Sequence, residues 1–300
     1  MDGFLIIDKS AGCTSHDVVQ AVRRILGIRK VGHTGTLDPF ATGVLPMAVG
    51  EATKAIPFLD EAVKEYQAVL RLGIATDTQD TEGRVVSERH WQGISPEEVR
   101  AAAARFVGMI QQVPPMFSAL KREGVPLYRL ARRGEEVERE PREVTIHRLT
   151  LERIELPEVA FTVRCSRGTY VRTLAADLGD RLGCGAHLRE LRRTLSGPFI
   201  VAAAVSLDLL AQRVREGRVA ELLIPATAVL VHLPEVPLTE QGAVRVRHGI
   251  APEAHDSSAW PAAGVAPGCR VRLTRVGELV AVATGAEGPT LRLARVFQPS

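Results

Sequence analysis

Asp38 is the only acidic residue between positions 30 and 46, a segment made mostly of glycine, threonine and apolar residues, with one histidine, His33. Pro39 holds the preceding aspartate in an extended or turn conformation, and the small neighbours leave room for a substrate. A carboxylate placed in this way can act as a nucleophile or as a base. An Asp-Pro pair in a glycine-rich loop is also ordinary turn chemistry, so the rest of the chain has to decide between the two interpretations.

Positive charge is concentrated in residues 164–193, which hold seven arginines against three acids. Isolated surface charges contribute little to stability, so contact with phosphate groups explains this density better than fold stability does. Within this segment, Arg189, Arg192 and Arg193 are predicted to lie on a short helix and to contact an RNA backbone.

A second basic stretch, residues 121–133, directly precedes a stretch that is rich in glutamate. Its basic residues include Arg129, Arg132 and Arg133. We interpret residues 114–143 as a protruding, mobile arm with a basic half that contacts RNA. The alternative is a solvated surface loop whose charges pair with one another.

The chain has only three tyrosines, Tyr66, Tyr128 and Tyr170, and each has a basic residue within two positions. An aromatic ring beside a basic residue is typical of sites that stack an unstacked base. The alternative is a partly buried strand residue with its hydroxyl at the edge. We favour that alternative for Tyr128 and leave both interpretations open for Tyr66 and Tyr170.

Bulk composition narrows the protein class. The 300 residues are 45% hydrophobic and 24% charged, with a net charge of +3 that permits a nucleic-acid partner without demanding one. The four cysteines form no C-x-x-C pair, and the histidines show no metal spacing, so no metal site is predicted. The acidic stretch 77–83 fails the pattern of a calcium loop and is interpreted as a hairpin turn. We see neither a signal peptide nor a membrane span, and we expect a cytoplasmic protein.

Hydrophobic periodicity predicts a mixture of helices and strands. Helices are expected over 15–26, with Ser15 as N-cap, from 96 to about 107, and over 171–182; strands are expected over 4–7, 66–72, 149–156 and 159–166. These elements do not alternate as regular strand–helix units. The pattern therefore favours an α+β fold with a mixed, largely antiparallel central sheet flanked by helices and loops.

Prolines at 225, 234 and 237 interrupt the chain after the last long helical stretch. Three short strands punctuated by glycine follow, at 270–273, 279–283 and 291–296. We therefore expect a large domain over 1–230, with the arm at about 114–143 as an insertion, and a small β-rich domain over 231–300.

Taken together, these motifs resemble the TruB family of tRNA pseudouridine-55 synthases. The resemblance runs almost end to end, with one departure, Ser10, at a position where the family usually has proline. The matching segments are DKSAGCTS at 8–15, VGHTGTLDPFATGVLP at 31–46, KEY at 64–66, PMFSALK at 115–121, SRGTYVRT at 166–173, GCGAH at 183–187 and LRR at 191–193.

The resemblance implies a pseudouridine synthase fold with a C-terminal PUA-like RNA-binding domain. It implies isomerisation of uridine-55 in the T loop of tRNA, by base flipping and an aspartate-dependent break and re-formation of the glycosidic bond. No cofactor, metal or obligate protein partner is expected, and the protein is expected to be a monomer. Whether the aspartate attacks the nucleoside or assists elimination through a glycal is left open.

The resemblance also implies roles for individual residues. Asp38 matches the essential aspartate, Tyr66 the tyrosine that stacks on the flipped base, and Arg172 the arginine that pairs with the aspartate. The positions expected to contact the substrate are His33, Tyr170 and Leu191, with Lys9 and Lys64 as candidates for the phosphate backbone.

Two other functions compete with this interpretation. An RNA-guided synthase of the dyskerin type shares the aspartate loop and the PUA domain, but the arm and the Thr-Asp-Thr-Gln-Asp block at 76–80 favour the stand-alone tRNA enzyme. A non-catalytic tRNA-binding chaperone would not need Asp38, Tyr66 and Arg172 together.

Overall fold

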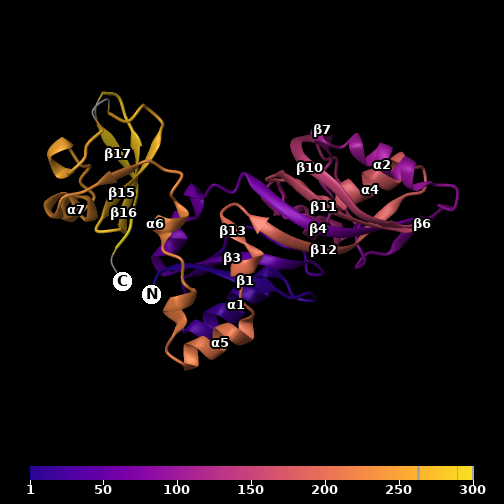
Figure 1. The fold of residues 1–300 in the computed structure, drawn as a ribbon, viewed down its shortest axis with the longest axis horizontal. Coiled ribbons are helices and arrows are strands. Elements are labelled where there is room, and N and C mark those ends of the chain that lie inside the picture. Colours follow the sequence, from indigo (N-terminus) through magenta and orange to yellow (C-terminus); the bar gives the residue numbers. More distant parts are fainter. Residues whose placement is uncertain (262–263, 289, 299–300) are drawn as a thin grey trace.

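Two β-sheets organise the computed structural model, which describes residues 1–261, 264–288 and 290–298. A nine-stranded sheet forms the large body and a four-stranded sheet forms a smaller lobe at the other end of the molecule (Figure 1). In the described part of the large sheet, β12 and β3 form the one parallel pair, and the other pairs are antiparallel. The predicted α+β class with a mixed, largely antiparallel sheet is confirmed.

The main path of the large sheet runs β1-β3-β12-β4-β11-β10-β7. Its strands are β1 (Gly3–Lys9), β3 (Thr42–Val49), β12 (Ala186–Ser196), β4 (Val63–Leu72), β11 (Glu158–Ser166), β10 (Arg142–Glu155) and β7 (Gly108–Gln112), with β2 (Val31–His33) beside β3 and β13 (Phe199–Ile200) beside β12. The small sheet contains β14 (Glu235–Pro237), β15 (Arg270–Arg275), β16 (Glu278–Gly285) and β17 (Leu291–Val296). Two separate hairpins pair β5 (Ile74–Thr76) with β6 (Val85–Glu88) and β8 (Lys121–Arg122) with β9 (Val125–Pro126).

The α-helices are α1 (Ser15–Leu26), α2 (Pro96–Ala104), α3 (Leu127–Ala131), α4 (Val171–Arg181), α5 (Leu207–Arg215), α6 (Ala226–Val229) and α7 (Glu240–Arg247). Short 3₁₀ turns are η1 (Gly50–Phe58), η2 (Val201–Ala203), η3 (Val219–Leu222) and η4 (Ala254–Asp256). No helix in the described ranges is both long and apolar enough to cross a membrane.

Local sequence explains where the helices begin and end. Ser95 and Glu98 cap the start of α2 reciprocally, as the sequence predicts. The start of α1 is capped in the same way by Thr14 and Asp17, so Ser15 is the first residue of the helix and not its cap. Gly27 ends α1 with φ 68°, a left-handed conformation that glycine adopts without strain.

The predicted short helix around residues 189–193 is wrong, because this segment belongs to strand β12. The pairing of β12 with β4 shifts register between Leu188 and Glu190 and again between Arg193 and Leu195. Each bulge breaks the two-residue alternation that identifies a strand in a sequence. Arg189, Arg192 and Arg193 are then spaced three and four positions apart, as residues on one face of a helix would be.

Helices α2 and α4 lie together near the β10–β7 end of the large sheet, and α1 packs against α5 at its β1 end (Figure 1). The main core runs through the centre of the sheet, where side chains such as Leu70, Val163 and Leu188 are buried together. A second core joins the two sheets, because Val282 and Phe297 of the small lobe pack with Phe4 and Phe199.

The small sheet begins at Glu235, among the prolines at 225, 234 and 237 that mark the predicted domain boundary. Its three antiparallel strands β15, β16 and β17 confirm the strands expected at 270–273, 279–283 and 291–296. The division into domains 1–230 and 231–300 remains a prediction, since the shared core joins the two parts.

Helix α4 carries Arg172 and packs on β12 at Gly179, where no side chain fits. A Cβ added to Gly179 would overlap the backbone nitrogen of Ala186 and the backbone carbon of Gly185. The close approach of α4 to the sheet therefore depends on glycine at this position.

We predict that Gly179→Ala destabilises the protein by about 1–3 kcal/mol or more, because the helix must move off the strand to admit the methyl group. Urea unfolding followed by circular dichroism measures this change. Gly93→Ala is the matched control, since a Cβ at Gly93 meets no atom within 4 Å. Equal midpoints for the two variants would contradict the packing argument.

Candidate active site

Arg172 lies in the first turn of α4, and the start of this helix is anchored from β7. The backbone N–H of Tyr170 donates to Gln112 Oε1 at 2.8 Å, and Gln112 Nε2 donates back to the Tyr170 carbonyl at 3.0 Å. Gln112 is itself buried. An amide side chain therefore satisfies both backbone groups of the residue that precedes the helix, which fixes where Arg172 enters the site.

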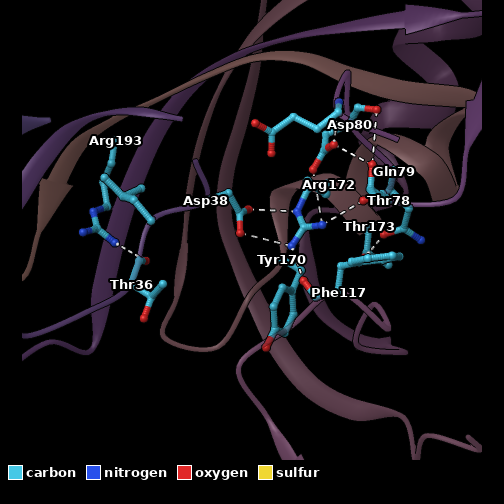
Figure 2. Close-up of polar contacts among 12 residues, drawn as sticks. Thr36, Asp38, Thr78, Gln79, Asp80, Phe117, Tyr170, Arg172, Thr173 and Arg193 are labelled. Atoms are coloured by element: carbon cyan, nitrogen blue, oxygen red, sulfur yellow. Dashed lines mark hydrogen bonds and ion pairs between the residues drawn. The ribbon is translucent and has the colours of Figure 1, made fainter. Parts of the chain in front are cut away.

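The Arg172 guanidinium joins the start of α4 to three other segments of the chain (Figure 2). Nε lies 2.8 Å from Asp38 Oδ2, and Nη2 donates to Asp38 Oδ1 at 3.2 Å. Nη1 donates to the Thr78 carbonyl at 2.8 Å, and Nη2 donates to the Phe117 carbonyl at 2.8 Å. With only 3% of its side chain exposed, Arg172 acts as a fixed fork rather than as a surface charge.

Asp80, which was not predicted as a site residue, completes this arrangement. Its Oδ2 lies 3.4 Å from Arg172 Nη1, and its Oδ1 accepts from Thr78 Oγ1 at 2.5 Å and from the Glu82 N–H at 3.0 Å. The segment 77–83 is the turn of the β5–β6 hairpin, as expected. The sequence signal for Asp80 is an acidic residue in a turn that does not fit a calcium loop. Such a carboxylate is free to pair with an arginine instead.

Hydrogen bonds from two side chains to the backbone hold the loop that carries Asp38. The Leu37 N–H donates to Ser15 Oγ at 2.8 Å, and Ser15 Oγ donates to the Leu37 carbonyl at 3.1 Å. Lys9 Nζ donates to the carbonyls of Ser10, Pro39 and Ala41 at 2.9, 3.0 and 2.7 Å. Lys9 is buried, so its prediction as a phosphate contact is corrected: its ammonium group binds the loop itself.

Asp38 keeps 32% of its side chain exposed, so a substrate atom can reach the carboxylate. Burial raises the pKa of the Asp38 carboxyl group, and the Arg172 guanidinium opposes that rise by stabilising the charged form. The neighbouring Asp80 carboxylate raises the Asp38 pKa further, and Lys9 lowers it. The net shift of the Asp38 pKa is upward, and the paired Arg172 guanidinium favours the ionised form against the effect of burial.

Tyr66 and Leu191 lie on the adjacent strands β4 and β12, and each is 7% exposed. Burial raises the pKa of the Tyr66 phenol to about 12, while the nearby Arg193 charge works in the opposite direction. The phenol is therefore neutral at physiological pH. Its position is compatible with the stacking role that the sequence predicts.

His33 and Lys64 flank the same loop. Burial, followed by the charge of Arg193, lowers the pKa of His33, so the imidazole is neutral at physiological pH. Burial lowers the pKa of Lys64 to about 8. A Cβ added to Gly35 would lie 2.9 Å from Lys64 Nζ, so this ammonium group touches the loop directly. Tyr170 precedes α4, and its side chain lies beside Arg172 (Figure 2).

The three arginines of β12 differ in their environments. Arg192 pairs with Asp8 at 2.7 Å, and Arg189 pairs with Glu158. Both arginines line a groove of about 670 Å³ together with Leu191. Arg193 is completely buried and donates only to backbone carbonyls. Its prediction as an RNA backbone contact is therefore wrong, because the register shift in β12 turns its side chain into the protein.

The predicted arm contains the β8–β9 hairpin and helix α3, and it meets the site through the Phe117 carbonyl. Arg129, Arg132 and Arg133 are exposed along this arm. Arg132 lies 5.7 Å from the centre of the Tyr128 ring, and Arg133 forms a loose pair with Glu135 at 3.8 Å. These arginines remain available to a phosphate backbone.

In the described ranges, no group of three or more His, Cys, Asp or Glu residues is arranged to hold a metal ion.

Comparison with known proteins places this geometry in a family. Residues 23–171 match the model of the TruB family pseudouridylate synthase N-terminal domain, and residues 172–231 match that of the tRNA pseudouridylate synthase B C-terminal domain. The proteins named tRNA pseudouridine synthase B from Geotalea uraniireducens and Burkholderia pseudomallei are 56% and 49% identical to the chain. The first alignment covers 99% of this chain and 98% of the relative, and the second covers 96% and 94%.

Two solved structures resemble the chain over 99% of its length, each with a TM-score of 0.74. One is a chain of an H/ACA RNP bound to a substrate RNA containing 2'-deoxyuridine, at 27% identity, and the other is a chain of a Cbf5–Nop10–Gar1 complex, at 29% identity. The alignments cover 85% of each of those chains. With close relatives matched along nearly their whole length, the chain belongs to the TruB family of pseudouridylate synthases.

Proposed function

We propose that this protein converts uridine-55 in the T loop of tRNA to pseudouridine. The observation that carries the proposal is the fork that Arg172 forms with Asp38, because it pairs one reachable carboxylate with a buried cation in a site that also holds the buried Tyr66. Relatives at 49–56% identity are named tRNA pseudouridine synthase B, and the chain spans nearly their full length, which supports the same substrate class.

The reaction breaks the N1–C1′ bond of the nucleoside and forms a C5–C1′ bond to the same uracil. It is an isomerisation, so atoms and electrons balance without a second reactant. Extruding the target base from its stack costs a few kcal/mol. Stacking of the base on Tyr66 returns about 1–3 kcal/mol of that cost, and Leu191 offers an apolar wall beside the ring.

Asp38 then acts on the extruded nucleoside either as a nucleophile or as a base that assists elimination. In both routes the carboxylate has to be charged when the substrate arrives. Arg172 favours the charged carboxylate without blocking it, because Arg172 is itself buried and leaves the Asp38 side chain partly exposed. The Tyr66 hydroxyl lies in the same core and is a candidate proton carrier at the sugar.

We propose that RNA is held by surfaces around this site. The exposed arginines Arg129, Arg132 and Arg133 of the arm contact the phosphate backbone, and Arg189 and Arg192 contribute from the groove beside Leu191. His33, Lys64 and Tyr170 contact the substrate next to the catalytic loop. The four-stranded lobe at 235–296 serves as the PUA-like RNA-binding domain.

An RNA-guided synthase is the second candidate, since the solved structures that the chain resembles include an H/ACA RNP. The stand-alone function is better supported by the high identity to complete tRNA pseudouridine synthase B chains. We accordingly propose a monomer that needs no guide RNA or protein partner.

The purified protein is expected to form pseudouridine at position 55 of an unmodified tRNA transcript in the absence of other macromolecules. Mass spectrometry of ribonuclease fragments identifies the modified position. Asp38→Asn should abolish the product while tRNA affinity stays near that of the wild type, because the amide keeps the shape and loses the reactive charge. Product formation by this variant would refute the role of Asp38, and dependence on an added guide RNA would favour the second candidate.

The acid limb of the pH–rate profile should report the ionisation of Asp38, since activity rises as the carboxyl loses its proton. Asp80→Asn removes a negative neighbour, lowers the Asp38 pKa and should move this limb to lower pH. Arg172→Met removes the stabilising cation and should move the limb to higher pH. Single-turnover rates across pH measure both shifts.

Asp77→Asn is the control for this experiment, because Asp77 lies in the same turn and pairs with Arg84 instead. Its profile should coincide with that of the wild type. Shifts of Asp80→Asn and Arg172→Met in the same direction would show that the limb does not report Asp38.

Replacing Arg129, Arg132 and Arg133 together with glutamine should weaken tRNA binding and flatten its salt dependence. Each lost phosphate contact should reduce the slope of log K against log salt by about 0.7–0.9. Filter binding between low and moderate salt measures the slope. The matched control replaces Arg100, Arg213 and Arg218, which are ion-paired to nearby glutamates. Equal slopes for the two triple variants would place the arm arginines off the RNA.

A further inference from the structure

Arg193 is a buried cation without a carboxylate partner. Its exposed fraction is 0%, and in the described part of the chain it forms no ion pair. Arg172 and Arg192 on either side of the site each have an aspartate partner. Burying an uncompensated charge is costly, so the hydrogen bonds that Arg193 makes have to account for its presence.

Those hydrogen bonds all go to the two ends of the catalytic loop. Nη2 donates to the Gly35 carbonyl at 3.0 Å and Nη1 to the Thr36 carbonyl at 3.2 Å, both just before Asp38. Nε donates to the Val44 carbonyl at 2.8 Å, just after the loop. Figure 2 shows the contact with Thr36 on the opposite side of Asp38 from Arg172.

The backbone of Arg193 holds the same loop. Residue 193 pairs with Gly43 where β12 runs parallel to β3, and a Cβ on Gly43 would overlap the Arg193 carbonyl oxygen. Gly43 has φ 99°, a conformation that side chains rarely adopt. Main chain and side chain of one residue thus define the path of the loop on both sides of Asp38.

Arg193 also faces Tyr66. The two residues are directly opposite in the antiparallel β12–β4 pair, so their side chains lie on the same face of the sheet. The Arg193 charge opposes the rise that burial causes in the pKa of the Tyr66 phenol, as expected for two side chains in neighbouring positions.

We propose that Arg193 is a positioning residue that sets the Asp38 carboxylate and the Tyr66 hydroxyl relative to each other through one guanidinium. It fixes the loop by its three carbonyl contacts, and it holds the Tyr66 side chain as its direct cross-strand neighbour on the same face of the sheet. This inference rests on the proposed function, and it extends that function to a residue that never touches RNA.

The test replaces Arg193 with lysine, which keeps the charge but loses the fork that spans the loop. Arg193→Lys should slow single turnover of saturating tRNA about 10- to 100-fold, the effect of a small misplacement of reacting groups, while tRNA affinity stays near wild type. Leu70→Ala, a buried substitution on β4, is the control for a general loss of stability. It should keep near-wild-type turnover at temperatures where it is folded.

A double-mutant cycle with Tyr66→Phe separates positioning from simple structural support. If Arg193 acts partly through the Tyr66 hydroxyl, the combined loss in rate is smaller than the product of the two single losses. Multiplicative losses would overturn the coupling to Tyr66. Wild-type turnover in Arg193→Lys would overturn the positioning role altogether.

Hydrogen exchange provides a readout that does not depend on catalysis. Amides of residues 34–44 should exchange faster in Arg193→Lys than in the wild type, and Leu70→Ala should leave the ratio of this segment to the rest of the sheet unchanged. Unchanged exchange in Arg193→Lys would refute the anchoring. A wild-type protein that forms no pseudouridine, yet shows faster loop exchange in the variant, would refute the proposed function and not the anchoring of the loop.

Discussion

The site depends on a single guanidinium that is shared between two carboxylates and two backbone carbonyls. Arg172 brings together the Asp38 loop, the β5–β6 turn with Asp80 and the arm at Phe117, which are far apart in the chain. A planar fork with five donors can satisfy all four partners at once, whereas a lysine presents a single charged nitrogen to such a set. The start of α4, held by Gln112, is consequently as much a part of the site as the acid itself.

Two further cations hold the loop from the protein side. Lys9 binds the carbonyls of Pro39 and Ala41, and Arg193 binds those of Gly35, Thr36 and Val44. Neither forms an ion pair with a carboxylate in the described ranges, so loop carbonyls are the main hydrogen-bond partners of both. A loop rich in glycine loses much conformational entropy when it is ordered, and these hydrogen bonds to charged donors offset that loss.

Sequence patterns predicted the parts of the site that a local motif contains. Asp38 stands out in its loop, whereas Arg172 was proposed from the family resemblance; the structure pairs the two side chains. Asp80 and Arg193 could not be assigned in this way, because their roles come from long-range contacts. The segment that contains Asp80 was interpreted as a hairpin turn, and Arg193 was predicted to lie on the surface and contact RNA. The register shifts in β12 place the Arg193 side chain inside the protein. The α+β class followed from element order, but strand neighbours such as β12 beside β3 have no local signal.

The balance of charge explains how an acidic centre can accept a polyanion. The Asp38 and Asp80 carboxyl groups share one guanidinium, that of Arg172. Lys9 lies close enough to lower the Asp38 pKa, and Arg193 acts on Tyr66, His33 and Lys64. These buried cations make the wall behind the loop positive without occupying the space in front of Asp38. On the proposed function, this arrangement favours the approach of a phosphate backbone and leaves room for the nucleoside beside Asp38.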